Sequence, residues 1–281
     1  MFRPAAGNDI MREFLKRLGR KPLFVEWSAR LGLHGLFGAI YRFFFAPAGG
    51  KHELCVAGRR AQFHVYSEKA VRALDSLGGE RPMLEFLMRR LAPGDCFYDV
   101  GSATGLYAVF LAQVVGEKGQ VVAFEPQRDS YIRLRENVKL NRLRNVEAFR
   151  LALGDQTASA ILQTPGVAGR GRILAPNEKL AQSGEQIEVA RGDEFIQSHG
   201  LPTPRAIKID VEGHEYSVLA GLRHTLSLPS CEIICCEIHP RFLRPRFEAE
   251  DVLGLLRAAG FNEIEIHPRG EDLHAWASKR G

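Results

Sequence analysis

The densest cluster of ionisable side chains lies where a strand pattern changes to a helix pattern, in IKIDVEGHEYSVLAG at residues 207–221. Apolar and polar residues alternate as far as position 211, which is the period of a β-strand, and an apolar helical pattern follows. The junction carries Asp210, Glu212 and His214, and Lys208 precedes it. A carboxylate there can hold a hydroxyl group or take its proton, and histidine titrates near neutral pH. We therefore predict catalytic roles for Asp210 and Glu212. Lys208 and His214 are predicted to bind the molecule that carries this hydroxyl group, which is called the acceptor below.

A second strand pattern, CEIICCEIHP at residues 231–240, ends in two further functional groups. Neighbouring parallel strands end at the same edge of a sheet, so Glu237 and His239 are expected beside Asp210. His239 is predicted to be catalytic and Glu237 to contact the acceptor. Two close carboxylates also suggest a metal ion, but no third ligand is evident in the sequence, and no metal site is predicted. The structural alternative, a helix cap or an ion-pair partner, applies most to Glu215, Lys208 and His214.

A glycine-containing turn follows an earlier strand pattern, in YDVGSATG at residues 98–105. Gly101 and Gly105 permit a tight turn and a close backbone approach, and the helix that follows offers unpaired N–H groups to an anion. The turn does not match the G-x-G-x-x-G fingerprint of nicotinamide cofactors, because positions 103 and 106 are Ala and Leu. The pattern D-x-G-x-x-x-G, which starts at Asp99, instead resembles the first motif of S-adenosylmethionine (SAM) methyltransferases.

The next strand pattern, VVAFEP, ends in an acid about 20 residues after the glycine turn, where a carboxylate can accept both ribose hydroxyls of a nucleoside. The third strand pattern with its exit loop is VEAFRLALGD at residues 146–155, and its final aspartate could reach an adenine amino group. The structural alternatives are a surface glutamate that caps the next helix and an ordinary turn aspartate. The predicted cofactor-binding residues are Asp99, Gly101, Ser102, Gly105, Glu125, Pro126, Asp155 and Asp210.

These segments together resemble the FkbM-type SAM-dependent methyltransferases over roughly residues 80–270. The most specific match is K-I-D-V-E-G-x-E-x-x-V-L-x-G, which is present from Lys208 to Gly221. The family usually has Ala-Asn-Ile between the loop glycines, whereas this chain has Ser-Ala-Thr at 102–104. The resemblance implies a Rossmann-like seven-stranded domain, SAM as the cofactor, and O-methylation of a hydroxyl on a small molecule or sugar.

The elements that must position these residues alternate between strand and helix from about residue 80. This alternation predicts an α/β fold with a mostly parallel, doubly wound sheet, in which ligands bind beyond the carboxyl ends of the strands. Residues 156–190 interrupt the alternation with a Gly/Pro-rich polar loop between two short strands. We expect a basic helical extension at 1–50, a β-hairpin with its lead-in at 51–79, and the methyltransferase domain at 80–281.

Composition favours a cytoplasmic protein without a membrane span. The net charge is +5, and the five cysteines form no CxxC pair, so reduced thiols packed in a core are expected. The most apolar N-terminal run, at 31–46, is interrupted by His34 and Arg42 and is too short to span a bilayer. Residues 10–21 predict a basic amphipathic helix, which either packs on the core, covers the acceptor cleft or associates peripherally with a membrane.

Two other functional classes remain open from the sequence alone. One is a methyltransferase-like protein that binds a partner without catalysis, which the glycine turn and the acidic strand ends argue against. The other is a nucleic-acid methyltransferase, with which the positive net charge is compatible. However, no N/D-P-P-Y/F segment follows the strand at 207–211, and no basic, aromatic-rich stretch lies beside the predicted cleft. No specific nucleic-acid partner is therefore predicted, and the oligomeric state stays open.

Overall fold

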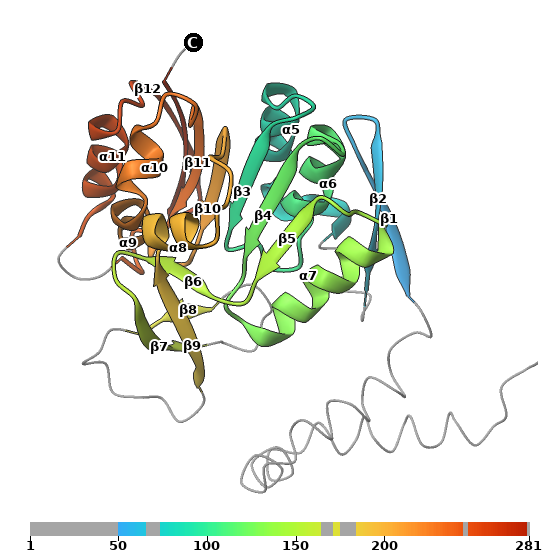
Figure 1. Cartoon of the computed structure of the whole chain (residues 1–281), viewed down its shortest axis with the longest axis horizontal. Coiled ribbons are helices and arrows are strands. Elements are labelled where there is room, and N and C mark those ends of the chain that lie inside the picture. The colour runs from blue at the N-terminus through green and yellow to red at the C-terminus, as the bar shows by residue number, and fades with distance from the viewer. Residues whose placement is uncertain (1–49, 66–73, 164–170, 175–183, 244–246, 280–281) are drawn as a thin grey trace, which may run out of the picture. The chain divides into compact units, whose positions relative to one another are not determined.

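The computed structural model describes residues 50–65, 74–163, 171–174, 184–243 and 247–279 (Figure 1). The chain divides into two compact units, and the larger one comprises Cys55–Ala61 and Glu80–Gly281. All of the predicted site residues belong to this larger unit. The predicted helix at residues 10–21 lies outside the described residues.

A seven-stranded sheet forms the centre of the larger unit. Its four central pairings, from β11 through β10, β3 and β4 to β5, are parallel, and β13 is antiparallel to both of its neighbours. The predicted Rossmann-like, mostly parallel sheet is therefore confirmed. The strands in spatial order are β12 (Glu263–Arg269), β13 (Asp272–Ser278), β11 (Ile233–Ile238), β10 (Ala206–Asp210), β3 (Cys96–Val100), β4 (Gln120–Phe124) and β5 (Val146–Phe149).

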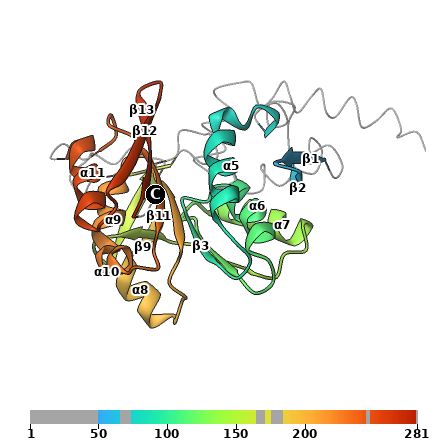
Figure 2. The same cartoon turned by 90° about the horizontal axis from the view of Figure 1, so that it is seen from above.

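The three central strands β11, β10 and β3 are buried because helices cover both faces of the sheet. Strands covered on both faces are expected to be almost continuously apolar, as CFYDV and IICCEI are. Figures 1 and 2 show one group of helices on one face of the sheet and a second group on the other. The first group is α5 (Arg81–Arg90), α6 (Leu106–Val115) and α7 (Arg128–Leu140). The second is α8 (Gly192–Ser198), α9 (Glu215–Gly221), α10 (Arg223–Ser227) and α11 (Ala249–Ala258).

Four of the five cysteines are buried in this core, as the sequence predicted, whereas Cys55 is exposed. All five are free thiols. Burial raises the pKa of Cys96 and of Cys231 to about 12, so these two thiols stay protonated at neutral pH. They serve as small apolar side chains.

A second sheet of four strands lies beside the first, in the order β6 (Ala152–Gly154), β9 (Gly184–Arg191), β7 (Ala158–Gln163) and β8 (Arg172–Ile173). The sequence predicted a single strand over VEAFRLALGD. The structure instead divides this segment between β5 in the first sheet and β6 in the second. The second sheet has its own apolar cluster, which includes Leu162 and Ile187. This second sheet occupies much of residues 156–190, which were predicted as a loop between two short strands.

The expected hairpin near the N-terminus is formed by β1 (Lys51–Val56) and β2 (Arg59–His64). Ala57 and Gly58 connect the strands with φ of 46° and 80°. Two successive left-handed residues match the twist of a two-residue hairpin. A 3-10 turn, η1 (Leu77–Gly79), comes shortly before α5 in the sequence. Among the helices of the described segments, none is long and apolar enough to cross a membrane.

Gly221, the last residue of α9, lies against the end of β6. A Cβ atom at this position would lie 1.8 Å from the Gly154 carbonyl oxygen. We expect Gly221→Ala to lower the free energy of unfolding by about 1–3 kcal/mol, because overpacking outweighs the higher helix propensity of alanine. Denaturant titration of both proteins measures this difference.

Gly254 in α11 provides the matched control, because a Cβ atom there would meet nothing within 4 Å. Gly254→Ala is expected to raise the free energy of unfolding by roughly 0.5–1 kcal/mol. Equal stabilisation by both substitutions would contradict the close contact between α9 and β6.

Candidate active site

The glycine turn between β3 and α6 packs directly on the end of β10. Gly101 has φ of +80°, and a Cβ atom there would lie 1.8 Å from the Asp210 carbonyl oxygen. The amides of Gly101 and Ser102 donate to the Phe124 carbonyl oxygen at 3.0 and 3.1 Å, which ties the turn to the end of β4. Only glycine fits this contact, so the first glycine of the motif has a steric explanation.

Asp99 is fully buried and holds the start of α6. Its Oδ2 accepts a hydrogen bond from the Ala108 amide at 3.1 Å, and the Ser102 hydroxyl donates to the Asp99 carbonyl oxygen at 3.1 Å. Burial raises the pKa of the Asp99 carboxyl group, while the nearby Lys208 ammonium opposes that shift. Asp99 and Ser102, which were predicted to bind the cofactor, thus shape the turn and the helix that follows it.

Glu125 follows β4 and supports the same turn from the other side. One carboxylate oxygen accepts from the Ala103 amide at 2.7 Å and the other from the Gln127 amide at 2.9 Å. Burial raises the pKa of Glu125 to about 7, although both hydrogen bonds favour the ionised form. Each carboxylate oxygen has a second lone pair, so the group can still accept a hydroxyl.

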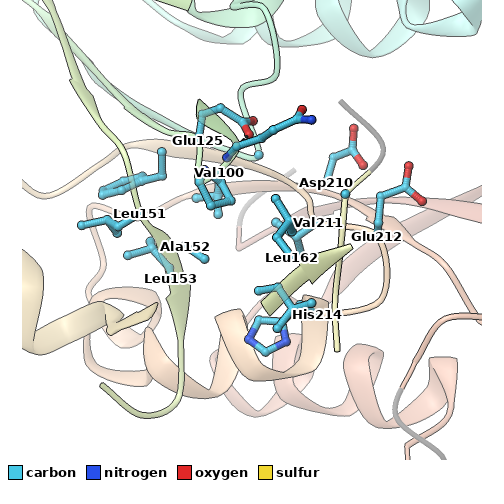
Figure 3. A pocket seen from close by; sticks show the side chains of 16 residues that line it. Val100, Glu125, Leu151, Ala152, Leu153, Leu162, Asp210, Val211, Glu212 and His214 are labelled. Carbon is cyan, nitrogen blue, oxygen red and sulfur yellow. Dashed lines mark hydrogen bonds between the residues drawn. The ribbon is translucent and has the colours of Figure 1, made fainter. Parts of the chain in front are cut away.

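A pocket joins these residues to the acidic end of β10 (Figure 3). Its apolar lining comes from β3, β7 and the segment around β6, and its polar lining from the strand ends. This combination fits SAM, because an apolar slot suits the adenine ring and a carboxylate suits the ribose. Lining residues include Val100, Gly101, Glu125, Pro126, Leu151, Leu153, Leu162, Asp210, Val211, Glu212 and His214.

Lys208 is buried under the pocket and links the glycine turn to Asp210. Its ammonium donates to the Gly101 carbonyl oxygen at 3.0 Å and to Asp210 Oδ2 at 3.2 Å. Burial alone would lower the pKa of Lys208, but the carboxylates of Asp210 and Asp99 reverse that effect and raise it. These contacts allow Lys208 to position Asp210, and its contact with an acceptor stays a prediction.

The chain turns sharply after β10 through two left-handed residues, Glu212 with φ of 48° and Gly213 with φ of 96°. A Cβ atom on Gly213 would lie 2.2 Å from the Phe242 carbonyl oxygen, so glycine is required there. A left-handed glutamate is unusual and costs conformational energy, which is typical of functional sites. The turn brings Asp210, Glu212 and His214 to one pocket, as the sequence predicted.

His239 follows β11 and faces the same carboxylates. Its Nδ1 pairs with Glu215 Oε1 at 2.7 Å, and its Nε2 lies 3.8 Å from both Asp210 Oδ1 and Glu212 Oε2. Burial alone would lower the pKa of His239, but Glu215, Asp210 and Glu212 raise it to about 9. We expected a histidine that titrates near neutral pH, and the surrounding carboxylates explain the difference.

Glu215 is a functional candidate that the sequence pattern did not reveal. It is fully buried in the first turn of α9, and its Oε1 also accepts from the Gly213 amide at 2.8 Å. A glutamate in a first helical turn usually compensates the helix dipole at the surface, and this reading was the expected one. Its place within the Lys208–Gly221 motif was the one sign of a function. Its partner His239 could not be identified, because it is far away in the sequence.

Glu237, the predicted acceptor contact, is engaged by residues from β12 and β13. Its Oε2 lies 3.2 Å from His274 Nε2, and its Oε1 lies 3.4 Å from Arg269 Nη1. Burial would raise the pKa of Glu237, but His274 and Arg269 lower it to about 2. Arg269 also pairs with Glu80. The sequence did not indicate these partners, because antiparallel pairing between β11 and β13 brings them together.

Asp155 is, like Asp99, Ser102 and Gly105, a predicted cofactor residue that does not line this pocket. It follows β6 and lines a separate surface depression together with Arg191, Tyr216 and Phe247. The division of the predicted third strand between two sheets explains this placement. A contact between Asp155 and adenine therefore stays a prediction.

The fold and the pocket define the class of the protein. A glycine turn after β3, an acid after β4 and an acidic turn after β10 surround one pocket at the carboxyl edge of a Rossmann-like sheet, as in SAM-dependent methyltransferases. The chain belongs to the FkbM methyltransferase family. The family described as "Methyltransferase FkbM domain" matches residues 99–263.

Curated relatives agree with this assignment. The chain is 31% identical to the hexuronic acid methyltransferase AglP of Haloferax volcanii, over 78% of this chain and 85% of that protein. It is 28% identical to the 31-O-demethyl-FK506 methyltransferase FkbM of Streptomyces tacrolimicus, over 68% of this chain and 82% of that protein. A solved precorrin-6y C5,15-methyltransferase from Geobacter metallireducens GS-15 superposes with a TM-score of 0.45 at 12% identity, covering 70% of this chain and 87% of that one. The family match and the similarity to AglP show that this protein is a SAM-dependent methyltransferase.

The pKa of Glu125 predicts how cofactor affinity depends on pH. If the ionised carboxylate accepts the ribose hydroxyls, binding must first deprotonate a group whose pKa is about 7. Affinity for S-adenosylhomocysteine should therefore fall about tenfold between about pH 8 and about pH 6. Isothermal titration over this range measures the dependence.

Glu125→Gln should weaken binding at pH 8 by roughly 1–3 kcal/mol and remove most of the pH dependence. Glu117→Gln, at an exposed position after α6, serves as the matched control and should leave both unchanged. An unaltered pH profile in Glu125→Gln would place the ribose contact elsewhere.

Proposed function

We propose that this enzyme transfers the methyl group of SAM to a hydroxyl oxygen on a sugar or small molecule. The observation that carries the proposal is the position of Asp210 and Glu212, which line the cofactor pocket directly beside the glycine turn. A cofactor in the apolar part of the pocket would thus have carboxylates near its reactive end. Positioning of this kind contributes much of the rate of a displacement reaction.

When bound, SAM supplies an electrophilic methyl group on a sulfonium whose departure as a neutral thioether requires no acid. The residues of the chain must therefore align the acceptor and remove its proton. A carboxylate of the turn after β10 would accept the hydroxyl proton of the acceptor during methyl transfer. Glu212 is the proposed base, because it belongs to the left-handed turn after β10 that lines the pocket.

The acceptor class is supported by the relatives and by the chemistry of the pocket. One relative is named for a hexuronic acid and the other for a compound that lacks a 31-O-methyl group. Carboxylates accept hydrogen bonds from hydroxyl groups, which both kinds of acceptor provide. The family and the intact pocket favour this enzyme over the non-catalytic binding protein that the sequence left open.

Transfer of labelled methyl groups from SAM to a panel of acceptors tests the proposal. Uronic acid glycosides, neutral sugars and a polyhydroxylated macrolide represent the hydroxyl acceptors, and amine-bearing analogues of the same sugars serve as the comparison. Mass spectrometry of the product locates the new methyl group. Methylation at nitrogen alone would contradict the proposal.

Glu212→Gln is expected to reduce kcat by about 10²–10⁴-fold, the usual contribution of a general base, with little change in cofactor affinity. Initial rates and titration with S-adenosylhomocysteine separate the two effects. Glu265→Gln, whose side chain is 75% exposed on β12, is the matched control and should retain wild-type kinetics. Equal losses in turnover and cofactor affinity would make Glu212 a cofactor-binding or structural residue instead.

A further inference from the structure

The unusual feature of the acidic strand end is the orientation of His239. Its side chain is only 4% exposed, and Glu215 occupies Nδ1 at 2.7 Å. The opposite nitrogen, Nε2, is aimed at Asp210 Oδ1 and Glu212 Oε2 but lies 3.8 Å from each. That distance exceeds a hydrogen bond. Within the described residues, no hydrogen bond is formed by this nitrogen.

We propose that Asp210, Glu212 and His239 bind one divalent metal ion at the acceptor end of the pocket. The three ligand atoms lie within 4.8 Å of one another. Two metal–ligand bonds of about 2.1 Å can span up to about 4.2 Å, so a separation of 3.8 Å suits a shared ion. The sequence did not predict a metal because no third ligand was evident, and the pairing of β10 with β11 supplies it.

The surrounding contacts hold these ligands in place. A metal-binding histidine usually donates its other ring nitrogen to a carboxylate, and Glu215 provides that carboxylate for His239. Glu215 is itself held by the Gly213 amide at 2.8 Å. Lys208 binds the Asp210 oxygen that does not face His239. This outer layer of contacts orients the donor atoms before an ion arrives.

A second group of possible metal ligands, Glu237, His239 and Asp272, shares the same histidine. Glu237 Oε1 lies 3.7 Å from His239 Nε2, but Glu237 is already paired with Arg269 and His274. Its charge is therefore largely compensated from the far side. The ligand set of the site is one imidazole nitrogen and two carboxylate oxygens.

The chemistry of this ligand set indicates the class of metal. Imidazole suits first-row transition ions, and carboxylates suit Mg²⁺, Ca²⁺ and Mn²⁺. Mn²⁺ accepts both kinds of ligand, whereas Ca²⁺ and Mg²⁺ prefer sites made of oxygen alone. We therefore assign Mn²⁺, or a first-row ion of similar preference, to the site.

The role of the ion rests on the proposed function. Asp210 and Glu212 both line the pocket, so the coordination positions they leave open face the acceptor space. A metal ion there would bind the acceptor hydroxyl and lower its pKa. Acceptors that offer two adjacent oxygens, such as a sugar diol, would be favoured because they can chelate the ion. Glu212 could bind the ion through one oxygen and receive the proton on the other.

Direct measurement of Mn²⁺ binding to the full chain tests the site. Protein treated with EDTA and then dialysed is titrated with MnCl₂, and free Mn²⁺ is followed by its electron paramagnetic resonance signal. We expect one ion per chain, about tenfold or greater weakening in His239→Gln and in Asp210→Asn, and about 10–100-fold weakening in Glu215→Gln. His267→Gln, at a side chain 45% exposed on β12, is the matched control and should bind as the wild type does.

Circular dichroism shows whether each variant is folded, and the Asp210→Asn and Glu215→Gln variants keep the test decisive if His239→Gln does not fold. No Mn²⁺ binding by the wild type at millimolar concentration, or binding that all folded variants retain, would overturn the site. Titration of the metal-free protein with S-adenosylhomocysteine keeps the two proposals separate. Cofactor binding without Mn²⁺ binding overturns the metal site alone, whereas Mn²⁺ binding without methyl transfer supports the site and counts against the proposed function.

Discussion

The contact between the glycine turn and the end of β10 is the constraint on which the site depends. Gly101 lies so close to the Asp210 backbone that no side chain fits between them, and Lys208 joins the Gly101 carbonyl oxygen to the Asp210 carboxylate. The glycine turn and Asp210, which both line the pocket, therefore form one connected group. A shift of β3 or of β10 would therefore move the glycine turn and Asp210 together.

Buried charge is the second condition that shapes the site. Removing an ion from water costs several kcal/mol unless it is paired, so each buried charge requires a partner. Glu215 is paired with His239, and Glu237 with Arg269 and His274. These pairs connect α9, β11, β12 and β13, so the C-terminal strands contribute to the site without lining its pocket. The same pairs explain why the His239 and Glu237 pKa values shift in opposite directions from their ordinary values.

The four-stranded sheet contributes part of the wall of the pocket. Leu162 of β7 and Ile173 of β8 line the pocket opposite the ends of the central strands. The central sheet carries the glycine turn and the acidic strand end, while this second sheet supplies an apolar wall. Specificity for an acceptor is thus expected to depend on both sheets, because the acidic cluster lies where the pocket walls from the two sheets meet.

The sequence by itself determined the order of the central strands and helices, the glycine turn and most polar residues of the pocket. Those features are local: strand and helix periods are readable within a few residues, and parallel strands place their carboxyl ends at one edge. Only the tertiary structure decided that Lys208 points inward, that Asp155 lies outside the pocket, and that Glu215 orients His239. Each depends on which distant segments pair. The division of VEAFRLALGD between two sheets depends on β9, and the pKa of His239 depends on carboxylates at residues 210–215, more than 20 positions earlier. No local pattern carries that information.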